Sequence, residues 1–515
     1  MNINPITRMD YPDPDIIRVD DTYYMVSTTM HFFPGGAILR SYNLIDWEIV
    51  TYVFDKLDDT PGERLERELV NYGAGMWAPS FKYHSGTFYV MFNSHTGGAK
   101  TYLFKANSIE GPWEVTVLDE VFYDCALFFD DDEKSYVLHG NGTIRITELN
   151  EALTGPKQGG LDRVLYEDDC EGLHYEGTHI LKKDGYYYIF NINWPSGDIR
   201  TQWCHRAKKL TDDFECKQIF HNYYDFEGHG VAQGSVIDDV DGNWYCYLFE
   251  DAGAVGRIPV IMPMKWENGW PVVGINGSVP NEFNYPQTTK KLSSNLYTSD
   301  NFEYMVGSNG KMSVKKQWQW NHRPVDSLWY YVQGGGLGIS TGKLAINVTH
   351  ANNCLTQRML FPKCAAKVTI DATGLNNGDV AGLCGLQSAY GYVGIEKNAG
   401  NYYVVNRVKN VDDVVSSKCT GDCMPGELIE EVAIEGPVIT LAISAEFGKK
   451  EELLHFYYVD EATKQLVEIG KPHKMVYRLD HFTGYRFGLF VYSTKSVGGS
   501  AIFKKFEYIT DTLNE

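Results

Sequence analysis

Long apolar runs are missing from this chain of 515 residues. Nowhere do about 18 apolar residues follow one another, so the sequence predicts no membrane-spanning helix. The opening residues, MNINPITRMDYPDPD, contain no basic segment followed by an apolar one. We therefore expect no secretory signal, and a location in the cytoplasm.

Positive charge is scarce as well, with 46 Lys and Arg against 67 Asp and Glu and a net charge of −21. Such a surface repels phosphate backbones and anionic lipid head groups, so we expect neither nucleic acid nor a membrane as partner. A neutral ligand rich in hydroxyl groups suits this charge. An acidic surface that only keeps the protein soluble explains it equally well.

The ten cysteines are scattered rather than packed into a disulfide framework, so we expect reduced, mostly buried thiols. Cys419 and Cys423 in KCTGDC suggest a metal clip, but no second Cys or His pair stands nearby at zinc-ligand spacing. A surface loop is the better interpretation. The segment QGGGLGISTG lacks the GxxxxGK[ST] pattern and a following helix, which favours a hairpin turn over a phosphate-binding loop.

Aromatic residues and glycine are abundant: 14% of the chain is aromatic, with 35 Tyr, and there are 50 Gly. This composition favours strands and tight turns over helices. The length indicates two or three cores. We expect an almost entirely β protein.

An internal repeat is the strongest structural signal. Five segments each look like a turn that leads into a half-buried aromatic strand: DDTYYMV, SGTFYVM, DEKSYVL, KDGYYYIF and VDGNWYCYL. Their matching residues are Tyr24, Tyr89, Tyr136, Tyr188 and Tyr245. The steps of 65, 47, 52 and 57 residues between them are close to the length of a four-stranded propeller blade. The sequence therefore predicts a five-bladed β-propeller over residues 1–300.

Polar side chains recur where the preceding strand of each repeat begins. Trp77, Asp124, Glu176 and Gln233 stand twelve residues before the matching tyrosine, and Asp13 stands eleven before its own. If these strands are the innermost of their blades, the five residues ring one mouth of the central channel. Three of them are acidic.

Carboxylates gathered at a channel mouth repel one another and raise one another's pKa. A single Asp at a strand start is usually a turn or cap residue. Three acidic residues at equivalent repeat positions beside a tryptophan favour a functional site.

The repeats stop after GRIPVIMPMKWENGWPVV, and a polar linker is expected near residues 285–312. Beyond it, alternating strands such as KLAINVTH, NYYVVNRV and GYRFGLFVYST are separated by Gly, Asn and Asp turns. This pattern is typical of a β-sandwich. We place this second domain at residues 313–515.

Four segments closely resemble glycoside hydrolase family 43: YPDPDIIRVDDTYYMVSTT, GMWAPSFKYHSGTFYV, YDCALFFDDDEKSYV and YEGTHILKKDGYYYIF. QWQWNHRP resembles the β-sandwich that follows the propeller in the xylosidase-like members of that family. The resemblance covers nearly the whole chain. Each motif alone is weak, whereas four in order at propeller spacing are specific.

The resemblance implies three catalytic roles: Asp13 in PDPD as general base, Glu176 in YEGTHI as general acid, and Asp124 in YDCALF as the group that modulates the pKa and orientation of the acid. The usual IDPSLF and TEGPH of the family are altered here, so the shape around the carboxyl groups is expected to differ. An inverting glycosidase needs an ionised base and a protonated acid on opposite faces of the sugar. We therefore predict inversion, with Asp13 and Glu176 roughly 6.5 to 9.5 Å apart.

Further residues match substrate and metal positions of the family. Trp77 and Phe33 match walls of its pentose pocket, although ordinary propeller packing is the alternative, above all for Phe33. Arg257 in VGRIPV matches an arginine that binds substrate, with a surface position as the alternative. His229 resembles a histidine near an axial cation, commonly calcium, and a core histidine bonded to a backbone carbonyl is the alternative. Gln233 is expected to line the same channel.

The resemblance implies an exo-acting enzyme that releases α-L-arabinofuranose from xylan side chains or arabinoxylo-oligosaccharides and needs no cofactor for its chemistry. β-D-Xylosidase activity on xylo-oligosaccharides, or both activities, is the alternative. A carbohydrate-binding propeller without catalysis, and a retaining fructan-type hydrolase, are further alternatives. The latter normally opens on Asn-Asp-Pro, whereas Pro12 precedes Asp13 here. The oligomeric state and the role of the sandwich are left open.

Overall fold

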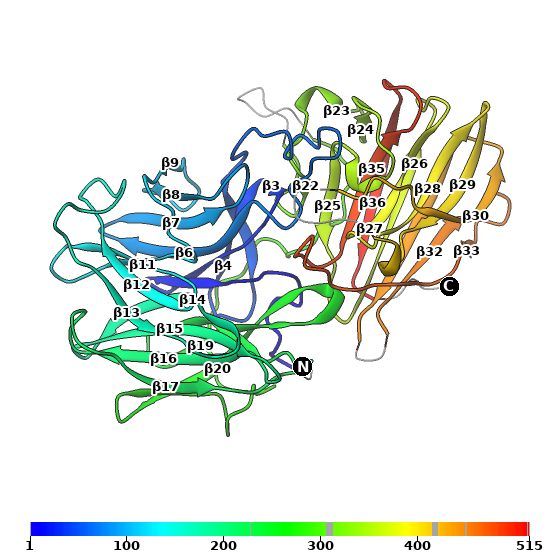
Figure 1. Cartoon of the computed structure of the whole chain (residues 1–515). Coiled ribbons are helices and arrows are strands. Elements are labelled where there is room, and N and C mark those ends of the chain that lie inside the picture. Colours follow the sequence, from blue (N-terminus) through cyan, green and yellow to red (C-terminus); the bar gives the residue numbers. More distant parts are fainter. Residues whose placement is uncertain are drawn as a thin grey trace.

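A computed structural model describes residues 2–226, 228–304, 313–414, 421–448, 451–511 and 513. Strands dominate these residues, as Figure 1 shows. The helices among them are short 3-10 turns, η1 (Gly253–Val255), η2 (Asp326–Leu328), η3 (Val348–His350) and η4 (Val411–Asp413). In this part of the chain no helix is long and apolar enough to cross a membrane.

Five antiparallel sheets of four strands follow one another along the first part of the chain. The first is β1 (Asp15–Val19), β2 (Thr22–Ser27), β4 (Gly35–Ser41) and β5 (Glu48–Phe54). The second is β6 (Met76–His84), β7 (Thr87–Ser94), β8 (Lys100–Ala106) and β9 (Glu114–Val117). The third is β10 (Ala126–Phe129), β11 (Ser135–His139), β12 (Thr143–Glu148) and β13 (Asp162–Glu167). The fourth is β14 (Gly172–Lys183), β15 (Tyr186–Pro195), β16 (Thr201–Ala207) and β17 (Glu215–Phe220), and the fifth is β18 (Val231–Asp238), β19 (Trp244–Asp251), β20 (Arg257–Glu267) and β21 (Trp270–Val273).

The first strands of the five sheets form the inner ring of a propeller. β1 contacts β6 and β18, β6 contacts β10, β10 contacts β14, and β14 contacts β18, which closes the circle. The five repeat tyrosines all lie in the second strand of their blade, on β2, β7, β11, β15 and β19. The five-bladed propeller predicted from the repeat is confirmed, and the strand before each tyrosine is the innermost one.

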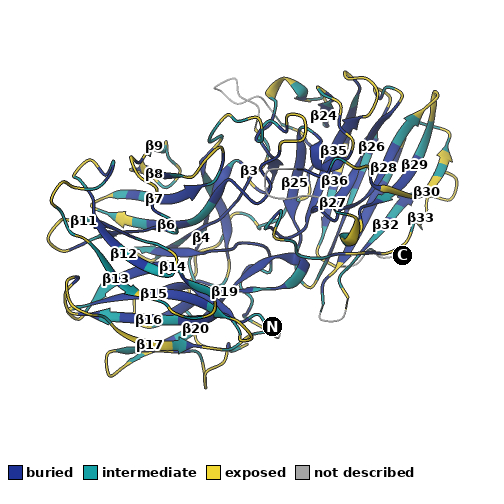
Figure 2. Cartoon of the chain, viewed as in Figure 1, coloured by how far each residue is buried: buried dark blue, intermediate teal, exposed yellow. Residues whose placement is uncertain are grey.

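Two larger sheets pack face to face in the second part of the chain. One runs β3 (Phe32–Phe33), β22 (Gln319–Asn321), β25 (Cys354–Arg358), β35 (Arg486–Ser493), β27 (Asp379–Leu386), β28 (Gly391–Asn398), β29 (Asn401–Val408), β30 (Glu427–Ile434). The other runs β23 (Trp329–Tyr331), β24 (Leu337–Ser340), β36 (Ser500–Ile509), β26 (Lys363–Asp371), β31 (Val438–Glu446), β32 (Leu453–Val459), β33 (Leu466–Glu468), with β34 (His473–Lys474) beside β32. The predicted β-sandwich is confirmed, and its strands are among the most buried of the molecule (Figure 2).

The two parts share a sheet. β3 lies between β2 and β4 in the sequence of the first blade, yet it pairs with β22 of the sandwich, Phe33 opposite Trp320. Between β21 and β22 the described residues form no strand, in line with a linker, but the domain limits 1–300 and 313–515 stay a prediction. The segment QGGGLGISTG forms the hairpin between β23 and β24, as expected, with Gly334, Gly335 and Gly336 at positive φ in the turn.

The nine cysteines in the described residues are free thiols, and most of them are buried. Cys423 is half-buried, and its thiol donates to the carbonyl oxygen of Gly421 at 3.5 Å. Its predicted loop partner Cys419 lies outside the described residues.

Candidate active site

Five residues at the start of the innermost strands line one small cavity at the mouth of the channel. Each has a positive φ: Asp13 at 51°, Ala78 at 28°, Asp124 at 51°, Gly177 at 65° and Gln233 at 65°. A left-handed backbone is unfavourable for residues other than glycine and tends to persist where function requires it. The same kink in all five blades therefore marks this mouth as the candidate site.

The ring differs from the predicted one by one residue in two blades. In the second and fourth blades the lining residues are Ala78 and Gly177, and the predicted Trp77 and Glu176 come one position earlier. A Cβ on Gly177 would lie 2.8 Å from Cγ of Gln233, so no larger side chain fits there. Glu176 therefore precedes the ring, and its side chain reaches residues of the third blade.

Asp13 is buried and paired with a buried cation. Nη1 of Arg257 donates to both carboxylate oxygens of Asp13, at 3.0 and 3.3 Å. Such charge-assisted bonds are stronger than neutral ones and hold the carboxylate in one orientation. Arg257 is 3% exposed, so the surface position that was its alternative is excluded.

The carboxyl group of Glu176 is held by two donors from the third blade. Nδ2 of Asn141 donates to Oε2 at 2.7 Å, and the Tyr123 hydroxyl donates to the same oxygen at 3.4 Å. Burial raises the pKa of Glu176, and the charge of Asp13 adds to this, while Asn141 and Arg200 oppose it. The result is a pKa above the ordinary value, as a proton donor requires.

Asp124 stands between the other two carboxyl groups in the chain order of the ring. Its Oδ2 accepts the backbone N–H of Gly177, directly after Glu176, and its own N–H donates to Asn93 at 2.8 Å. Burial and then the charge of Glu176 raise the pKa of Asp124 well above its usual range. The charge of Glu176 thus makes ionisation of Asp124 less favourable.

A buried network forms the floor of the cavity. Asp15 accepts from the Tyr247 hydroxyl at 2.8 Å and from the Phe81 N–H at 2.6 Å, and its Oδ1 lies 3.2 Å from Nδ1 of His179, which lines the cavity. Burial alone would raise the pKa of Asp15, but Lys82 and His179 outweigh it and the pKa is lowered. Asp15 is thus an ionised structural anchor.

Aromatic side chains from both domains pack beside Arg257, the partner of Asp13. Trp77 lies 4.2 Å from His95 and 5.8 Å from Phe482, measured between ring centroids. Phe482 comes from the sandwich loop before β35, and the guanidinium of Arg257 lies 4.3 Å from its ring centroid. The sandwich therefore contributes a side chain that packs against the partner of Asp13.

Asp10 fixes this loop against the propeller. Its Oδ1 accepts the N–H of Arg257 at 2.8 Å, and its Oδ2 accepts the N–H of Gly484 at 3.0 Å. One buried carboxylate thus ties the strand that carries Arg257 to the loop that carries Phe482.

Phe33 is not brought to the cavity. It is 3% exposed, belongs to the apolar core between the first two blades, and lies 6.2 Å from Phe54 between ring centroids. This is the ordinary packing that was its alternative.

Gln233 lines the cavity, and its N–H donates to Oε1 of Gln202 at 2.8 Å. His229, four residues earlier, does not line it. Nδ1 of His229 lies 2.8 Å from the carbonyl oxygen of Asp251, and the Asp251 carboxylate is paired with Arg200 at 2.7 Å. These surroundings do not form the set of oxygen ligands that calcium prefers. A calcium ion beside His229 stays a prediction, and no step below depends on it.

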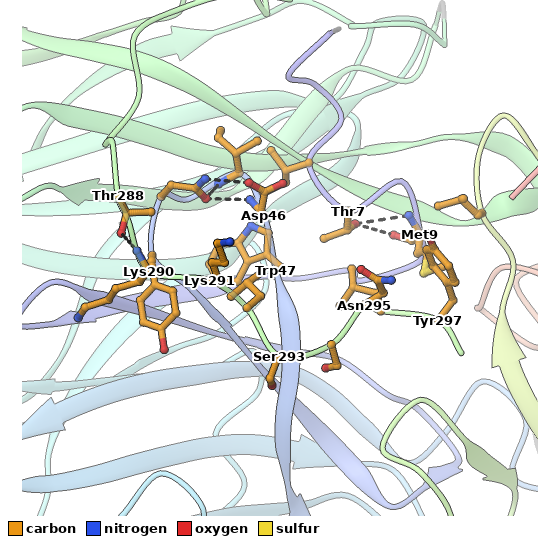
Figure 3. A pocket seen from close by; sticks show the side chains of 18 residues that line it. Thr7, Met9, Asp46, Trp47, Thr288, Lys290, Lys291, Ser293, Asn295 and Tyr297 are labelled. Atoms are coloured by element: carbon orange, nitrogen blue, oxygen red, sulfur yellow. Dashed lines mark hydrogen bonds between the residues drawn. The ribbon is translucent and has the colours of Figure 1, made fainter. Parts of the chain in front are cut away.

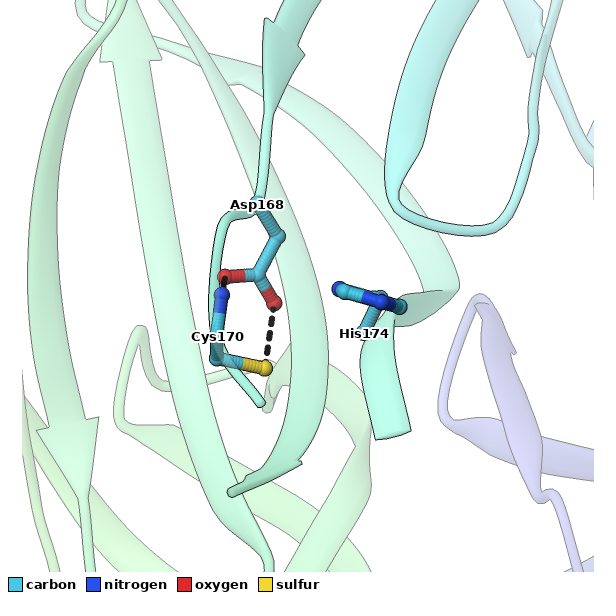
Figure 4. A group of neighbouring side chains, drawn as sticks. All are labelled: Asp168, Cys170 and His174. Atoms are coloured by element: carbon cyan, nitrogen blue, oxygen red, sulfur yellow. Dashed lines mark hydrogen bonds between the residues drawn. The ribbon is translucent and has the colours of Figure 1, made fainter. Parts of the chain in front are cut away.

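One further group in the described residues has metal-ligand chemistry, Asp168, Cys170 and His174 (Figure 4). Its central carboxylate accepts from two backbone N–H groups, Cys170 at 3.1 Å and Tyr175 at 3.0 Å. The thiol of Cys170 donates to it at 3.3 Å, and the amide of Asn193 at 3.1 Å. These bonds explain the group as the brace of the loop that leads into β14, and we assign it no metal.

A larger cavity of about 580 Å³ lies elsewhere, between the first blade and residues 288–297 (Figure 3). Its one carboxylate is Asp46, which accepts from Asn43 at 2.8 Å. A lining with a single carboxylate offers no acid and base pair, so the small cavity is the candidate active site.

The family model of glycosyl hydrolases family 43 matches residues 3–271, and that of the β-xylosidase C-terminal concanavalin A-like domain matches residues 310–509. The chain belongs to glycosyl hydrolases family 43. The carboxyl groups of the ring lie within the first of these matches.

Relatives within family 43 carry two activity names. A putative β-xylosidase of Xylanibacter ruminicola is 30% identical over 68% of this chain and 65% of its own length. A β-xylosidase of Formosa agariphila is 28% identical over 76% of this chain and 74% of its own. A non-reducing end α-L-arabinofuranosidase of Bacteroides ovatus is 22% identical over 86% of this chain and 84% of its own length.

Solved structures of family 43 proteins match nearly the whole chain. A bifunctional GH43-CE protein of Bacteroides eggerthii has a TM-score of 0.90 at 38% identity, over 99% of this chain and 64% of that one. A family 43 hydrolase engineered to display both endo-xylanase and exo-arabinofuranosidase activity has a TM-score of 0.87 at 26% identity, over 99% of both chains. This chain spans about two thirds of the first relatives of each kind, so activity and substrate are proposals.

Sequence reasoning missed Tyr123, Asn141, Arg200 and Phe482. Tyr123 directly precedes Asp124 in the sequence, so its place beside a predicted site residue could have indicated it. Nothing in the sequence near Asn141 or Phe482 indicates that either lies at the propeller mouth, because each reaches it from a loop outside the repeat.

Proposed function

We propose that this family 43 member is an inverting, exo-acting glycoside hydrolase that releases terminal pentoses from xylan-derived oligosaccharides. The observation that carries the proposal is the contrast between two carboxyl groups at one mouth. Asp13 is paired with Arg257, whereas burial raises the pKa of Glu176. An acid and a base with different protonation states are what inverting hydrolysis requires.

Asp13 is the proposed general base. It accepts a proton from water as the oxygen of that water attacks the anomeric carbon, and Arg257 holds its carboxylate toward the cavity. The guanidinium also faces the sugar and donates to a hydroxyl group there, since its Nε and Nη2 have no protein partner among the described residues.

Glu176 is the proposed general acid. Its carboxyl group gives its proton to the glycosidic oxygen as the bond to the anomeric carbon breaks, so that the leaving sugar departs as a neutral alcohol. Asp124 is the proposed modulator, because its carboxyl group interacts with the charge of Glu176 and is bonded to the next residue, Gly177. A separation of roughly 6.5 to 9.5 Å between Asp13 and Glu176 stays a prediction of this mechanism.

The names of relatives support attack at chain ends. The α-L-arabinofuranosidase of Bacteroides ovatus is named for the non-reducing end, and the engineered family 43 structure carries exo-arabinofuranosidase activity.

Of the two pentoses we propose α-L-arabinofuranose. The support is the family 43 structure with exo-arabinofuranosidase activity, which matches over 99% of both chains. β-D-Xylose is the second candidate, because the relatives from Xylanibacter ruminicola and Formosa agariphila are both named as β-xylosidases.

The test is product release from p-nitrophenyl α-L-arabinofuranoside and p-nitrophenyl β-D-xyloside by the wild type, Glu176→Gln and a matched control. Glu167→Gln is the control, since Glu167 is an exposed carboxylate of β13 outside the cavity. We expect the wild type to hydrolyse at least one glycoside. Glu176→Gln should lower this activity by roughly 10³ or more, and Glu167→Gln should leave it unchanged. A folded wild type that binds xylo-oligosaccharides but hydrolyses neither glycoside would favour the binding propeller instead.

A further inference from the structure

The hairpin of β14 and β15 extends beyond Glu176 at its open end. Glu176 lies opposite Ile192, and Leu173 lies opposite Trp194. Residues 194–200 therefore continue past the level of Glu176. Arg200 ends this hairpin, directly before β16.

The guanidinium of Arg200 is packed between two aromatic rings. It lies 5.0 Å from the centroid of Trp194 and 4.9 Å from that of Phe249. Arg257 lies 5.5 Å from the same Phe249 ring. Arg200 and Arg257 thus contact the same phenyl ring. Arg257 is bonded to the proposed base, Asp13. Arg200 lies close enough to Glu176 to lower its pKa.

Two N–H groups of Arg200 lack a protein partner among the described residues. Nη2 pairs with the carboxylate of Asp251 at 2.7 Å, whereas Nε and Nη1 are buried and have none. Arg200 is only 8% exposed. Buried donors without an acceptor are costly, and nearly all such groups in native proteins are paired.

The charges nearby indicate what kind of acceptor is missing. Asp251 already balances Arg200, and Asp13 already balances Arg257. A ligand with a full negative charge would be repelled by Glu176, Asp124 and Asp13. Neither arginine would be free to balance that charge, since each already pairs with a carboxylate. A neutral acceptor such as a sugar hydroxyl fits, and a uronate carboxylate does not.

We propose that Arg200 and Trp194 form a subsite for the sugar on the leaving-group side of the scissile bond. This inference rests on the proposed function, since it takes Glu176 as the group that protonates the leaving oxygen. The leaving sugar must lie next to that acid. Arg200 donates to its hydroxyl groups, and the half-buried indole of Trp194 packs against its apolar face. The substrate class is thus an oligosaccharide whose leaving group is a neutral sugar.

The test compares two leaving groups on the same pentose. The wild type, Arg200→Gln and Arg200→Lys are assayed on p-nitrophenyl pentosides, whose aryl ring bears no hydroxyl, and on arabinoxylo-oligosaccharides or xylobiose. Each assay is run at the pH optimum of its variant. We expect Arg200→Gln to lower kcat/KM on oligosaccharides about ten- to a hundredfold, as the loss of a hydrogen bond to a charged donor implies, and on aryl pentosides by no more than about threefold.

Two controls separate this role from a structural one. Arg145→Gln removes a surface arginine paired with Asp162 on the third blade and should change neither substrate. Arg200→Lys keeps the ion pair with Asp251 but loses the planar fork, so it should fold like the wild type and still lower the oligosaccharide rate selectively. Equal losses on both kinds of substrate, or no loss in either Arg200 variant, would overturn the subsite.

The pH profile is a second readout. The groups that face Glu176 are Asn141, Tyr123, Arg200, Asp13 and Asp124. Because Arg200 lowers the pKa of Glu176, its replacement by Gln should move the basic limb of kcat/KM to higher pH, and its replacement by Lys should not. A limb unmoved in Arg200→Gln would contradict the placement of Arg200 beside the acid. A wild type inactive on every pentoside would instead refute the proposed function itself.

Discussion

Asp124 is linked to Glu176 through the backbone, because the N–H of Gly177, the residue after Glu176, donates to the Asp124 carboxylate. Burial raises the pKa of both groups, and the charge of Glu176 raises that of Asp124 further. Each of the two groups therefore keeps its proton to a higher pH than an exposed carboxyl group does. The proposed reaction uses the proton of Glu176.

Replacing Asp124 by Asn tests this coupling. The substitution removes a negative charge beside Glu176, so the pKa of Glu176 should fall. Glu176 must be protonated to act, and the basic limb of the kcat/KM profile reports its pKa. We therefore expect that limb to move to lower pH, with a lower maximal rate, in a pH–rate series on an aryl pentoside.

The control for Asp124→Asn is Asp162→Asn, on the same blade but paired with Arg145 at the surface. Its profile should match the wild type. A basic limb that stays in place or moves to higher pH in Asp124→Asn would show that the charge of Asp124 does not raise the pKa of Glu176.

At this scale the sequence could predict Asp13, Asp124 and Glu176 because they recur with the repeat. It could not predict that Gly177 rather than Glu176 lines the ring, since that depends on a kink whose φ is not visible in the residue spacing. The sequence could not predict the position of Arg200 for another reason. Its neighbours Phe249 and Asp251 come from the next blade.

The loop between β34 and β35 is the element that completes the site. Phe482 in this loop has a φ of 56°, in the left-handed region, which is unfavourable for an aromatic residue. Asp10 holds the loop through Gly484, two residues later. A strained backbone maintained by such an anchor indicates that the position of the Phe482 ring matters to function.

Phe482→Gly separates function from stability. Glycine adopts this φ without strain, which offsets part of the packing lost with the half-buried ring, so the melting temperature should fall by no more than a few degrees. The wall over Arg257 and beside Trp77 is lost, and kcat/KM should drop about ten- to a hundredfold, in keeping with the loss of one buried aromatic contact with substrate.

Tyr330→Gly is the matched control, because Tyr330 is an exposed aromatic residue of the sandwich, away from the site. It should keep full activity. Unchanged kinetics in Phe482→Gly would mean that the sandwich does not take part in the reaction.

Element types were predictable where the sequence repeats or alternates, as in the blades and the sandwich strands. β3 was not, since its two residues, Phe32 and Phe33, lie within the first blade's sequence but pair with β22 almost 300 positions later. A pairing across that distance leaves no periodic pattern. Phe33 of this strand lies in the core between the first two blades.

One buried apolar cluster runs through both domains, and further buried contacts join them. Besides the pairing of β3 with β22, Nε of Arg358 in the sandwich donates to the carbonyl oxygen of Asp10 at 2.7 Å. The guanidinium of Arg486 lies 3.4 Å from the ring centroid of Phe32. Separating the two domains would expose these buried groups to water.

We therefore expect one cooperative unfolding transition for the full chain. Scanning calorimetry should give a single peak whose calorimetric and van't Hoff enthalpies agree. Two resolved transitions would show that the propeller and the sandwich fold independently and that the shared sheet adds little.

The central claim, an ionised base and a protonated acid on opposite faces of the sugar, is tested most directly by the configuration of the first product. Proton NMR during hydrolysis of an aryl α-L-arabinofuranoside, or of a β-D-xyloside if that is the substrate, resolves the two anomers before they equilibrate. We predict that the opposite anomer forms first, the β-anomer of arabinose or the α-anomer of xylose. First formation of the anomer that the substrate carries would contradict inversion, and with it the roles of Asp13 and Glu176.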